Sequence, residues 1–349
     1  MKILLLQLSD VHFNSHSNAV SSRPASIRGA VQEMVLECEA CFVVMTGDVA
    51  WSGQSAEYEQ AHLFFDQLRD ELRGLRSWQV EEVFIPGNHD CVLPKPDRVR
   101  EIIIKSILDE VKEVKAPFRP EDQLIEQCLQ VQNTFFDFYA RRAGRTLNST
   151  ERLCYTHRFE VGGRTFRFEC YNSAWMSQRT EDPGHLLIPL GQAKESEPVD
   201  LVVSLFHHPY NWLLPENRRA FRKEIEARSD LVMTGHEHVS EQYDKSTLDK
   251  TNLSYFEGAV LQEHGNDDSG FNAMVIDFEK RERQISTFLW RGDYYASTST
   301  SGWESFDRNV RLARARFENT PDFLKTLHDV GAPFTHSAKP QLCLKDLFV

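Results

Sequence analysis

Short apolar runs alternate with amphipathic stretches over the first ninety residues. The runs at 2–8, 41–46 and 82–86 are typical of strands buried on both faces of a parallel sheet. The stretches at 24–37 and 56–75 repeat their apolar residues at the spacing of a helix that packs on one side. This order predicts a βαβαβ unit with right-handed crossovers and a largely parallel sheet.

The pattern becomes helical after residue 97. Residues 99–114 and 120–142 have helical spacing and are interrupted around Pro117 and Pro120. The whole segment, 97–144, is too long for a plain connection, so we expect a helical insertion. It serves either as a lid over a pocket or as a packing extension that touches no substrate.

The pattern after residue 144 predicts more strands and one more helix. Gly162-Gly163 is a two-residue turn signal between two strand-like runs, and it predicts a hairpin. A helix rich in Arg and Glu is expected at 216–229. Strands are expected at 155–161, 165–171, 200–206 and 230–234, and antiparallel strands at 253–261, 273–278 and 284–290. Two facing sheets with helices outside would account for this order.

Five of the apolar runs end in short polar segments. Ligands gather outside the carboxyl ends of parallel strands, so these segments are expected to converge at one edge. They are Asp10-Val11-His12, Gly47-Asp48, Gly87-Asn88-His89-Asp90, His207-His208-Pro209 and Gly235-His236-Glu237-His238.

The residue types in these segments suit a pair of divalent metal ions. Such a pair needs about seven protein ligands, one of which is a bridging carboxylate. Asp48 follows Gly47, which allows a sharp exit from the strand, and is the best bridging candidate. Asn88 offers a neutral carbonyl oxygen. The absence of cysteine from all five segments disfavours a structural zinc site, whereas His, Asp and Asn suit Mn, Fe, Zn or Ni.

The five segments resemble those of the calcineurin-like metallophosphoesterases, which carry D-x-H, G-D, G-N-H-[D/E], an H-x-P-type histidine and G-H-x-H in this order. The resemblance covers roughly residues 1–295 apart from the insertion. It implies an α/β fold, a four-layer α/β/β/α metallophosphoesterase sandwich. We expect a metallophosphoesterase domain at 1–300 with the helical insertion at 97–144. A helical C-terminal tail at 301–349 could lead into a further domain of a longer parent protein.

The resemblance also implies a role for each residue of the site. One metal would be surrounded by Asp10, His12, Asp48 and His238, and the other by Asp48, Asn88, His207 and His236. In this family a metal-bound hydroxide attacks phosphorus in line, and the histidine of G-N-H assists the leaving group. That role falls to His89, with Asp90 placed to orient it or nearby groups. Two divalent ions are therefore expected, Mn first, with Fe, Zn, Ni or Mg as alternatives.

Several neighbouring residues have two interpretations. The H-x-P register favours His207 over His208 as the ligand, which leaves His208 to line the pocket or to sit behind the ligands. Asn172 either contacts substrate or stabilises a turn. Cys91 is expected to be a small packed residue. His16 either contacts substrate or, as favoured, is a solvated loop residue. The remaining histidines are expected to be structural or exposed, namely His157, His185, His264 and His328.

Composition narrows the class of protein. The 349 residues are 41% hydrophobic and 26% charged, as in a soluble globular protein, and no apolar run approaches the ~20 residues of a membrane helix. The first run is expected to be a core strand, not a signal peptide. Seven scattered cysteines suggest reduced thiols and a cytoplasmic protein. A net charge of −12 argues against broad, non-specific binding to nucleic acid.

The sequence therefore predicts a metal-dependent phosphoester hydrolase acting on a small phosphodiester or a nucleotide. A DNA or RNA nuclease of the same superfamily is the alternative, and a protein phosphatase comes third. The chain could also be the effector domain of a multidomain defence or signalling protein, with a protein partner reached through the C-terminal tail. No membrane partner is expected, and a catalytically dead binding module is least favoured because no metal position is missing.

Overall fold

The computed structural model describes residues 1–16, 18–93, 97–114, 122–193, 197–237, 242–246, 252–262 and 269–306. Within these residues the chain forms two β-sheets flanked by helices. His238, His264, His328 and the tail from 307 onward lie outside the described residues.

The first sheet has the strand order β12-β11-β10-β1-β2-β3, with β13 paired to β11. Its strands are β1 (Lys2–Leu8), β2 (Ala40–Met45), β3 (Gln79–Phe84), β10 (Gly270–Asp277), β11 (Glu282–Trp290), β12 (Tyr295–Thr300) and β13 (Glu304–Ser305). β1, β2 and β3 run parallel, as the predicted βαβαβ unit requires. β10, β11 and β12 join them in antiparallel pairing, as expected for the strands predicted at 273–278 and 284–290, so the parallel arrangement is confined to the βαβαβ part of the sheet.

The second sheet has the order β4-β5-β6-β7-β9-β8. Its strands are β4 (Cys154–Val161), β5 (Arg164–Tyr171), β6 (Leu201–Leu205), β7 (Leu231–Thr234), β8 (Gln242–Ser246) and β9 (Asn252–Glu257). The predicted hairpin is confirmed as β4 and β5, and both turn residues have positive φ, 55° at Gly162 and 76° at Gly163. β9 runs parallel to β7 and antiparallel to β8, so the strand expected at 253–261 is antiparallel on one side only.

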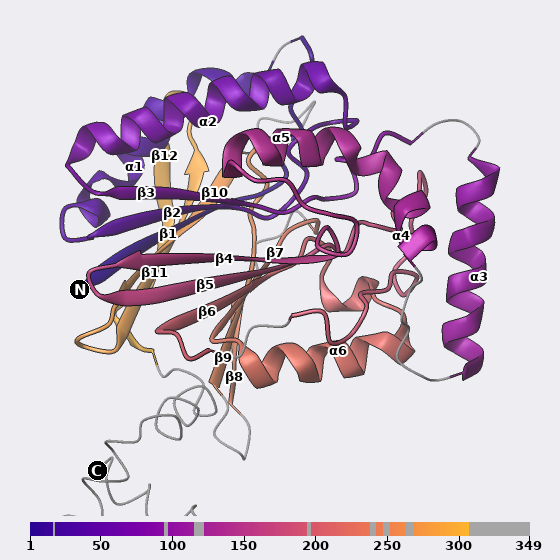
Figure 1. Cartoon of the computed structure of the whole chain (residues 1–349). Coiled ribbons are helices and arrows are strands. Elements are labelled where there is room, and N and C mark those ends of the chain that lie inside the picture. The colour runs from indigo at the N-terminus through magenta and orange to yellow at the C-terminus, as the bar shows by residue number, and fades with distance from the viewer. Residues whose placement is uncertain are drawn as a thin grey trace, which may run out of the picture.

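The layers stack in the order helices, sheet, sheet, helix (Figure 1). Helices α1 (Pro24–Val35) and α2 (Ser55–Leu75) cover the first sheet, and α6 (Pro215–Arg228) covers the second. The described residues also contain three short 3₁₀ turns, η1 (Ala19–Ser22), η2 (Gln130–Gln132) and η3 (Tyr210–Trp212). The fold is thus the expected four-layer α/β/β/α sandwich.

Aromatic packing joins the two sheets. The ring of Phe42 on β2 lies 5.4 Å from Phe159 on β4, 5.5 Å from Phe166 and 5.1 Å from Phe168 on β5, between ring centroids. All but Phe159 are fully buried. Such rings remove large apolar areas from water, so they fix the distance between the sheets and the relative position of their edges.

The helical insertion contains α3 (Arg98–Val114), α4 (Asp122–Leu129) and α5 (Asn133–Ala143). The helix expected at 120–142 is split by η2. Figure 1 places α3 and α4 at the end of the molecule toward which the parallel strands β1 to β3 run. Arg100, 4% exposed, donates to the carbonyl oxygens of Trp175 at 3.0 Å, Ser177 at 2.6 Å and Cys128 at 3.2 Å. The base of α3 is therefore fastened to the loop that follows β5.

The first residues of the expected helical tail belong to a strand. Glu304 and Ser305 pair with Arg283 and Glu282 as β13, because the exposed edge of β11 offers them backbone partners. In the described residues, no helix combines the length and the apolar character needed to cross a membrane.

His157 on β4 gives the fold a testable dependence on pH. Its Nε2 lies 3.1 Å from the Tyr139 hydroxyl, and burial lowers its pKa to about 4. The unfolded chain takes up this proton near pH 6.5, so stability is lost as the pH falls from 6.5 toward 4. Between pH 7 and pH 4, His157 should lower the free energy of unfolding of the wild type by on the order of 1–2 kcal/mol. We expect His157→Phe to lack this part of the decrease, as measured by urea unfolding. Exposed His185→Phe should parallel the wild type, and a parallel profile for His157→Phe would contradict this assignment.

Candidate metal centre

The polar segments at the ends of five parallel strands meet at one edge of the sandwich. β1, β2 and β3 deliver them from the first sheet, and β6 and β7 from the second. A hydrogen bond of 2.8 Å between His207 Nδ1 and the Thr46 carbonyl joins the two sheets at this edge. Because the carbonyl can only accept, Nδ1 carries the hydrogen and Nε2 is turned inward.

Four side chains converge closely in the interior of this edge. Asn88 Oδ1 lies 3.1 Å from His207 Nε2 and 3.0 Å from His236 Nδ1, and the two imidazole nitrogens are 3.3 Å apart. Asp48 Oδ2 lies 3.3 Å from His207 Nε2. These four residues are the set that the sequence predicts around one of the two metals.

Asp48 also belongs to a second group of donors. His12 Nε2 lies 3.9 Å from Asp48 Oδ2 and 4.0 Å from Asp10 Oδ1. One carboxylate oxygen is therefore close to both groups, as a bridging ligand must be. His238, the fourth residue expected in this second group, lies outside the described residues.

The backbone is held in an unfavourable conformation where these side chains emerge. The φ angles are 52° at Asp10, 52° at His12, 56° at Asp48 and 76° at His236. Among the described residues, Arg281 is the one other non-glycine residue with positive φ. Such conformations cost on the order of 1–3 kcal/mol each and persist where the surroundings impose them, commonly at functional sites. Strain at four predicted ligands therefore supports a functional role for this edge.

Glycines of the motifs make the close approach possible. A Cβ on Gly87 would meet the Asp48 carboxylate, and a Cβ on Gly47 would meet the ring of His207. A Cβ on Gly235 would meet the hydroxyl of Ser9 and come within 3.0 Å of Asp10 Oδ2. Any side chain at these three positions would push the donors apart.

The buried groups of the site differ in charge when no metal is bound. Burial raises the pKa of Asp48, but His207, His12 and His89 outweigh it and hold that pKa well below its usual value. Burial lowers the pKa of His207, and Asp48 raises it more, to about 10. The pKa of His236 falls to about 2 through burial and the neighbouring His208 and His207. Without metal, Asp48 and His207 thus form a buried ion pair, and a cation binding there would displace a proton.

His89 lies beside the donors with its ring fixed. Its backbone N–H donates to Asp48 Oδ1 at 2.8 Å, and its Nδ1 lies 2.8 Å from the Trp51 carbonyl. Nδ1 must carry the hydrogen in that contact, so Nε2 is the atom free to serve a substrate. The ring centroids of His89 and His12 are 4.5 Å apart.

Asp90 points away from the donors and into the protein. Its fully buried carboxylate accepts hydrogen bonds from the backbone N–H groups of Val49 at 3.2 Å, Ala50 at 2.9 Å and Gly87 at 2.9 Å. The Tyr58 hydroxyl donates at 2.8 Å. Burial and the nearby Asp48 raise the pKa of Asp90 to about 6. Asp90 thus ties the loop that follows β2 to the loop that follows β3.

The remaining residues that the sequence singled out, His208, Asn172 and Cys91, are buried behind the proposed metal ligands. His208 Nδ1 lies 2.9 Å from Ser173 Oγ and its Nε2 lies 3.4 Å from Glu181, while its ring packs 4.5 Å from that of His236. The Asn172 amide donates to Gln132 Oε1 at 2.7 Å, and its Oδ1 accepts from Ala174 N–H at 3.1 Å. This geometry agrees with the turn-stabilising alternative for Asn172. Cys91 is buried, as expected.

Two tryptophans at the site were not anticipated from the sequence. Trp51 lies 5.5 Å from His12 and 5.2 Å from His89, and Trp212 lies 4.2 Å from His236, between ring centroids. Trp51 follows the G-D segment by only three residues, so its position beside the motif was the available signal.

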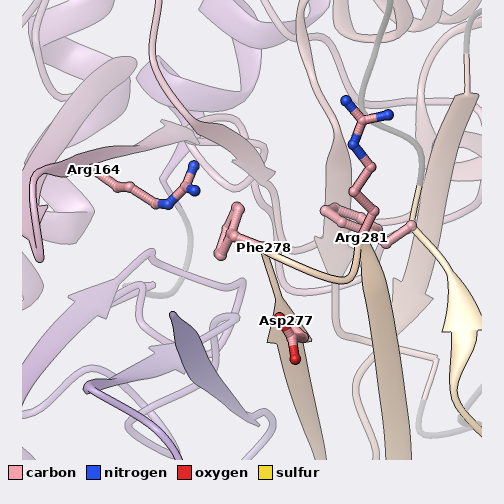
Figure 2. Close-up of a pocket in the computed structure, with 5 residues that line it drawn as sticks. Arg164, Asp277, Phe278 and Arg281 are labelled. Atoms are coloured by element: carbon pink, nitrogen blue, oxygen red, sulfur yellow. The ribbon is translucent and has the colours of Figure 1, made fainter.

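A cavity of about 170 Å³ lies far from these residues. It is lined by Arg164, Asp277, Phe278, Arg281 and Phe306, four of which are labelled in Figure 2. Asp277 pairs with Lys2 at the start of β1, whereas Asp10 follows the end of that strand. Seven residues of extended chain separate the two ends by roughly 23 Å. The cavity is therefore separate from the donors.

A family model described as calcineurin-like phosphoesterase matches residues 3–240. The chain belongs to the calcineurin-like phosphoesterase family. Membership implies metal-dependent hydrolysis of phosphoesters, and the donor set described above fits divalent metal ions.

Individual relatives are distant. The chain is 21% identical over 319 residues to the uncharacterized metallophosphoesterase-like protein YydB of Bacillus subtilis, covering 86% of this chain and 63% of YydB. The chain thus spans less than two thirds of that relative's length.

Solved structures with similarity include vacuolar protein sorting 29 from Cryptosporidium parvum, with 10% identity and a TM-score of 0.36 over 87% of this chain and 98% of that one. A predicted phosphoesterase from Streptococcus pneumoniae has 10% identity and a TM-score of 0.34 over 87% and 99%. A hypothetical protein from Thermus thermophilus has 14% identity and a TM-score of 0.39 over 87% and 100%.

The hydrogen bonds of Asp90 predict a cost for removing its charge. In Asp90→Asn one acceptor oxygen becomes an NH₂ group that faces backbone donors, so we expect a loss of about 2–4 kcal/mol in the free energy of unfolding. Tyr58→Phe removes one donor and should cost about 1 kcal/mol. Chemical denaturation measures both, with Asp70→Asn on the exposed side of α2 as the control. An Asp90→Asn protein as stable as this control would show that the carboxylate does not hold the two loops.

Proposed function

We propose that the chain is a phosphoester hydrolase with two divalent ions bridged by Asp48, acting on a small phosphodiester or a nucleotide. The observation that supports this most strongly is the shared position of Asp48 Oδ2. It lies 3.3 Å from His207 and 3.9 Å from His12, one member of each predicted ligand group. Manganese is our first choice among the metals, because carboxylate and amide carbonyl oxygens suit it.

The chain's own residues would hold the phosphoryl group and the ions in fixed positions. Asp10, His12 and His238 would complete one coordination sphere, and Asn88, His207 and His236 the other. When bound, the ions would neutralise charge on the phosphoryl oxygens and lower the pKa of water. The donors are already close together, so little rearrangement would be needed for binding.

His89 is proposed as the group that assists departure of the leaving oxygen. Its Nδ1 is occupied by the Trp51 carbonyl, so a proton for the leaving group can come only from Nε2. Asp90 acts as a positioning residue rather than a partner of this imidazole, because its oxygens accept from the backbone of both loops and from Tyr58.

Two observations support a small substrate. The net charge of −12 opposes binding along a nucleic-acid backbone. Helices α3 and α4 of the insertion lie at the end of the molecule toward which β1 to β3 run, which is the end that carries the donors (Figure 1). An insertion at that end can limit the room for a long polymer.

An activity panel with Asp48→Asn tests the proposal. We expect hydrolysis of bis(p-nitrophenyl) phosphate or a cyclic nucleotide with Mn²⁺, and a loss of kcat/KM of at least about 100-fold in Asp48→Asn. Loss of groups that merely orient metal ligands already costs about 10–100-fold. Asp70→Asn removes one exposed carboxylate outside the site and should keep full activity.

The other arms of the panel are single- and double-stranded DNA, RNA and a phosphopeptide. Turnover confined to a nucleic acid would replace the small-substrate proposal with a nuclease. No turnover of any substrate with any divalent metal would overturn the hydrolase, and full activity in Asp48→Asn would overturn the site.

A further inference from the structure

Trp51 presents an exposed indole at the edge of the proposed centre. Its side chain is 45% exposed, although it is in ring contact with His12 and with His89. Other large apolar side chains exposed in the described residues include Leu36 and Leu63, which lie on or beside the outer helices and away from the site histidines. Isolated exposed apolar residues are common, so the position beside two site histidines is the informative feature.

The backbone that carries Trp51 is held in place on both sides. Its N–H donates to the Phe13 carbonyl at 2.9 Å, and its carbonyl accepts from His89 Nδ1 at 2.8 Å. On either side, Ala50 N–H is bound by Asp90 and Ser52 N–H by Glu57, each at 2.9 Å. A ring carried on such a backbone is preorganised, so binding to it costs little ordering of the chain.

Trp212 is more enclosed than Trp51. Its indole N–H donates to Glu237 Oε1 at 2.5 Å, and its ring packs edge-on against His236 with centroids 4.2 Å apart. It is only partly exposed. Trp212 therefore supports a proposed ligand, whereas Trp51 presents more of its surface to solvent.

Positive charges on the side chains around the site histidines would be an alternative means of binding the substrate. Trp51, Trp212, Ser173 and Glu181 are described side chains in contact with the site histidines, and none of these four is cationic. Trp51 thus provides an exposed aromatic face beside His89. Planar rings stack on exposed aromatic side chains whatever their hydrogen-bonding pattern.

We propose that Trp51 forms the stacking wall of a subsite for a planar ring of nucleobase type, joined to the phosphoryl group on the side of His89. This inference rests on the proposed function and narrows its substrate class to nucleoside phosphoesters or their aryl equivalents. A stacked base contributes about 10- to 100-fold in affinity.

A pair of ligands that differ only in the base tests the subsite. AMP and ribose 5-phosphate share the phosphoryl group and the sugar, and calorimetric titration of the Mn²⁺-supplemented protein measures their binding without turnover. We expect the wild type to prefer AMP by about 10- to 100-fold, Trp51→Phe to keep part of this preference, and Trp51→Ala to bind the two ligands equally.

Trp303→Ala is the matched control. Trp303 is 43% exposed, and its ring lies 5.1 Å from Lys2 Nζ, at the opposite end of β1 from the site. It should keep the wild-type preference for AMP. Orthophosphate binding should be the same in Trp51→Ala as in the wild type, because the backbone carbonyl that holds His89 is retained.

Two results would overturn the subsite alone. One is equal binding of AMP and ribose 5-phosphate by the wild type while orthophosphate still binds in an Asp48-dependent way. The other is an unchanged preference for AMP in Trp51→Ala. If no phosphate compound binds with Mn²⁺, the proposed function fails together with the subsite.

Discussion

The Asp48 carboxylate is the feature on which the arrangement of the site depends. One oxygen is near both donor groups, and the other accepts the backbone N–H of His89. The carboxylate is buried and its pKa is held low by the surrounding imidazoles. A buried anion of this kind is costly without a compensating positive charge. His207 supplies that charge in the metal-free chain, and divalent ions would supply more of it in the proposed holoenzyme.

The fold maintains this unfavourable concentration of donors through constraints at a distance. Inter-sheet packing around Phe42 aligns the two sheets, and the His207–Thr46 hydrogen bond joins them where the strands end. The Asp90 carboxylate then ties the second and third strand loops together through their backbone N–H groups. The left-handed backbone at Asp10, His12 and Asp48 shows the cost of this arrangement, which the surrounding core must offset.

Much of the fold and the site could be predicted because the signals were local. Apolar runs fixed the positions of most strands, and the motif after each parallel strand had to lie at the same edge. The convergence of Asp10, His12, Asp48, Asn88, His207 and His236 follows from that topology. The parallel pairing of β9 with β7 was not predicted, since strand direction depends on long-range partners. The contacts of Asp90 with Val49, Ala50 and Tyr58 were also inaccessible, because they join separate loops. Trp51 was not identified, because the sequence does not show which aromatic side chains remain exposed.

The most direct test of the central claim is the metal content of the purified chain, combined with electron paramagnetic resonance after loading with Mn²⁺. A centre bridged by Asp48 predicts two ions per chain and the spectrum of a spin-coupled pair. In Asp48→Asn we expect at most one ion and no coupling. Saturation of the wild-type chain at one ion, or a coupled pair that survives in Asp48→Asn, would contradict the account.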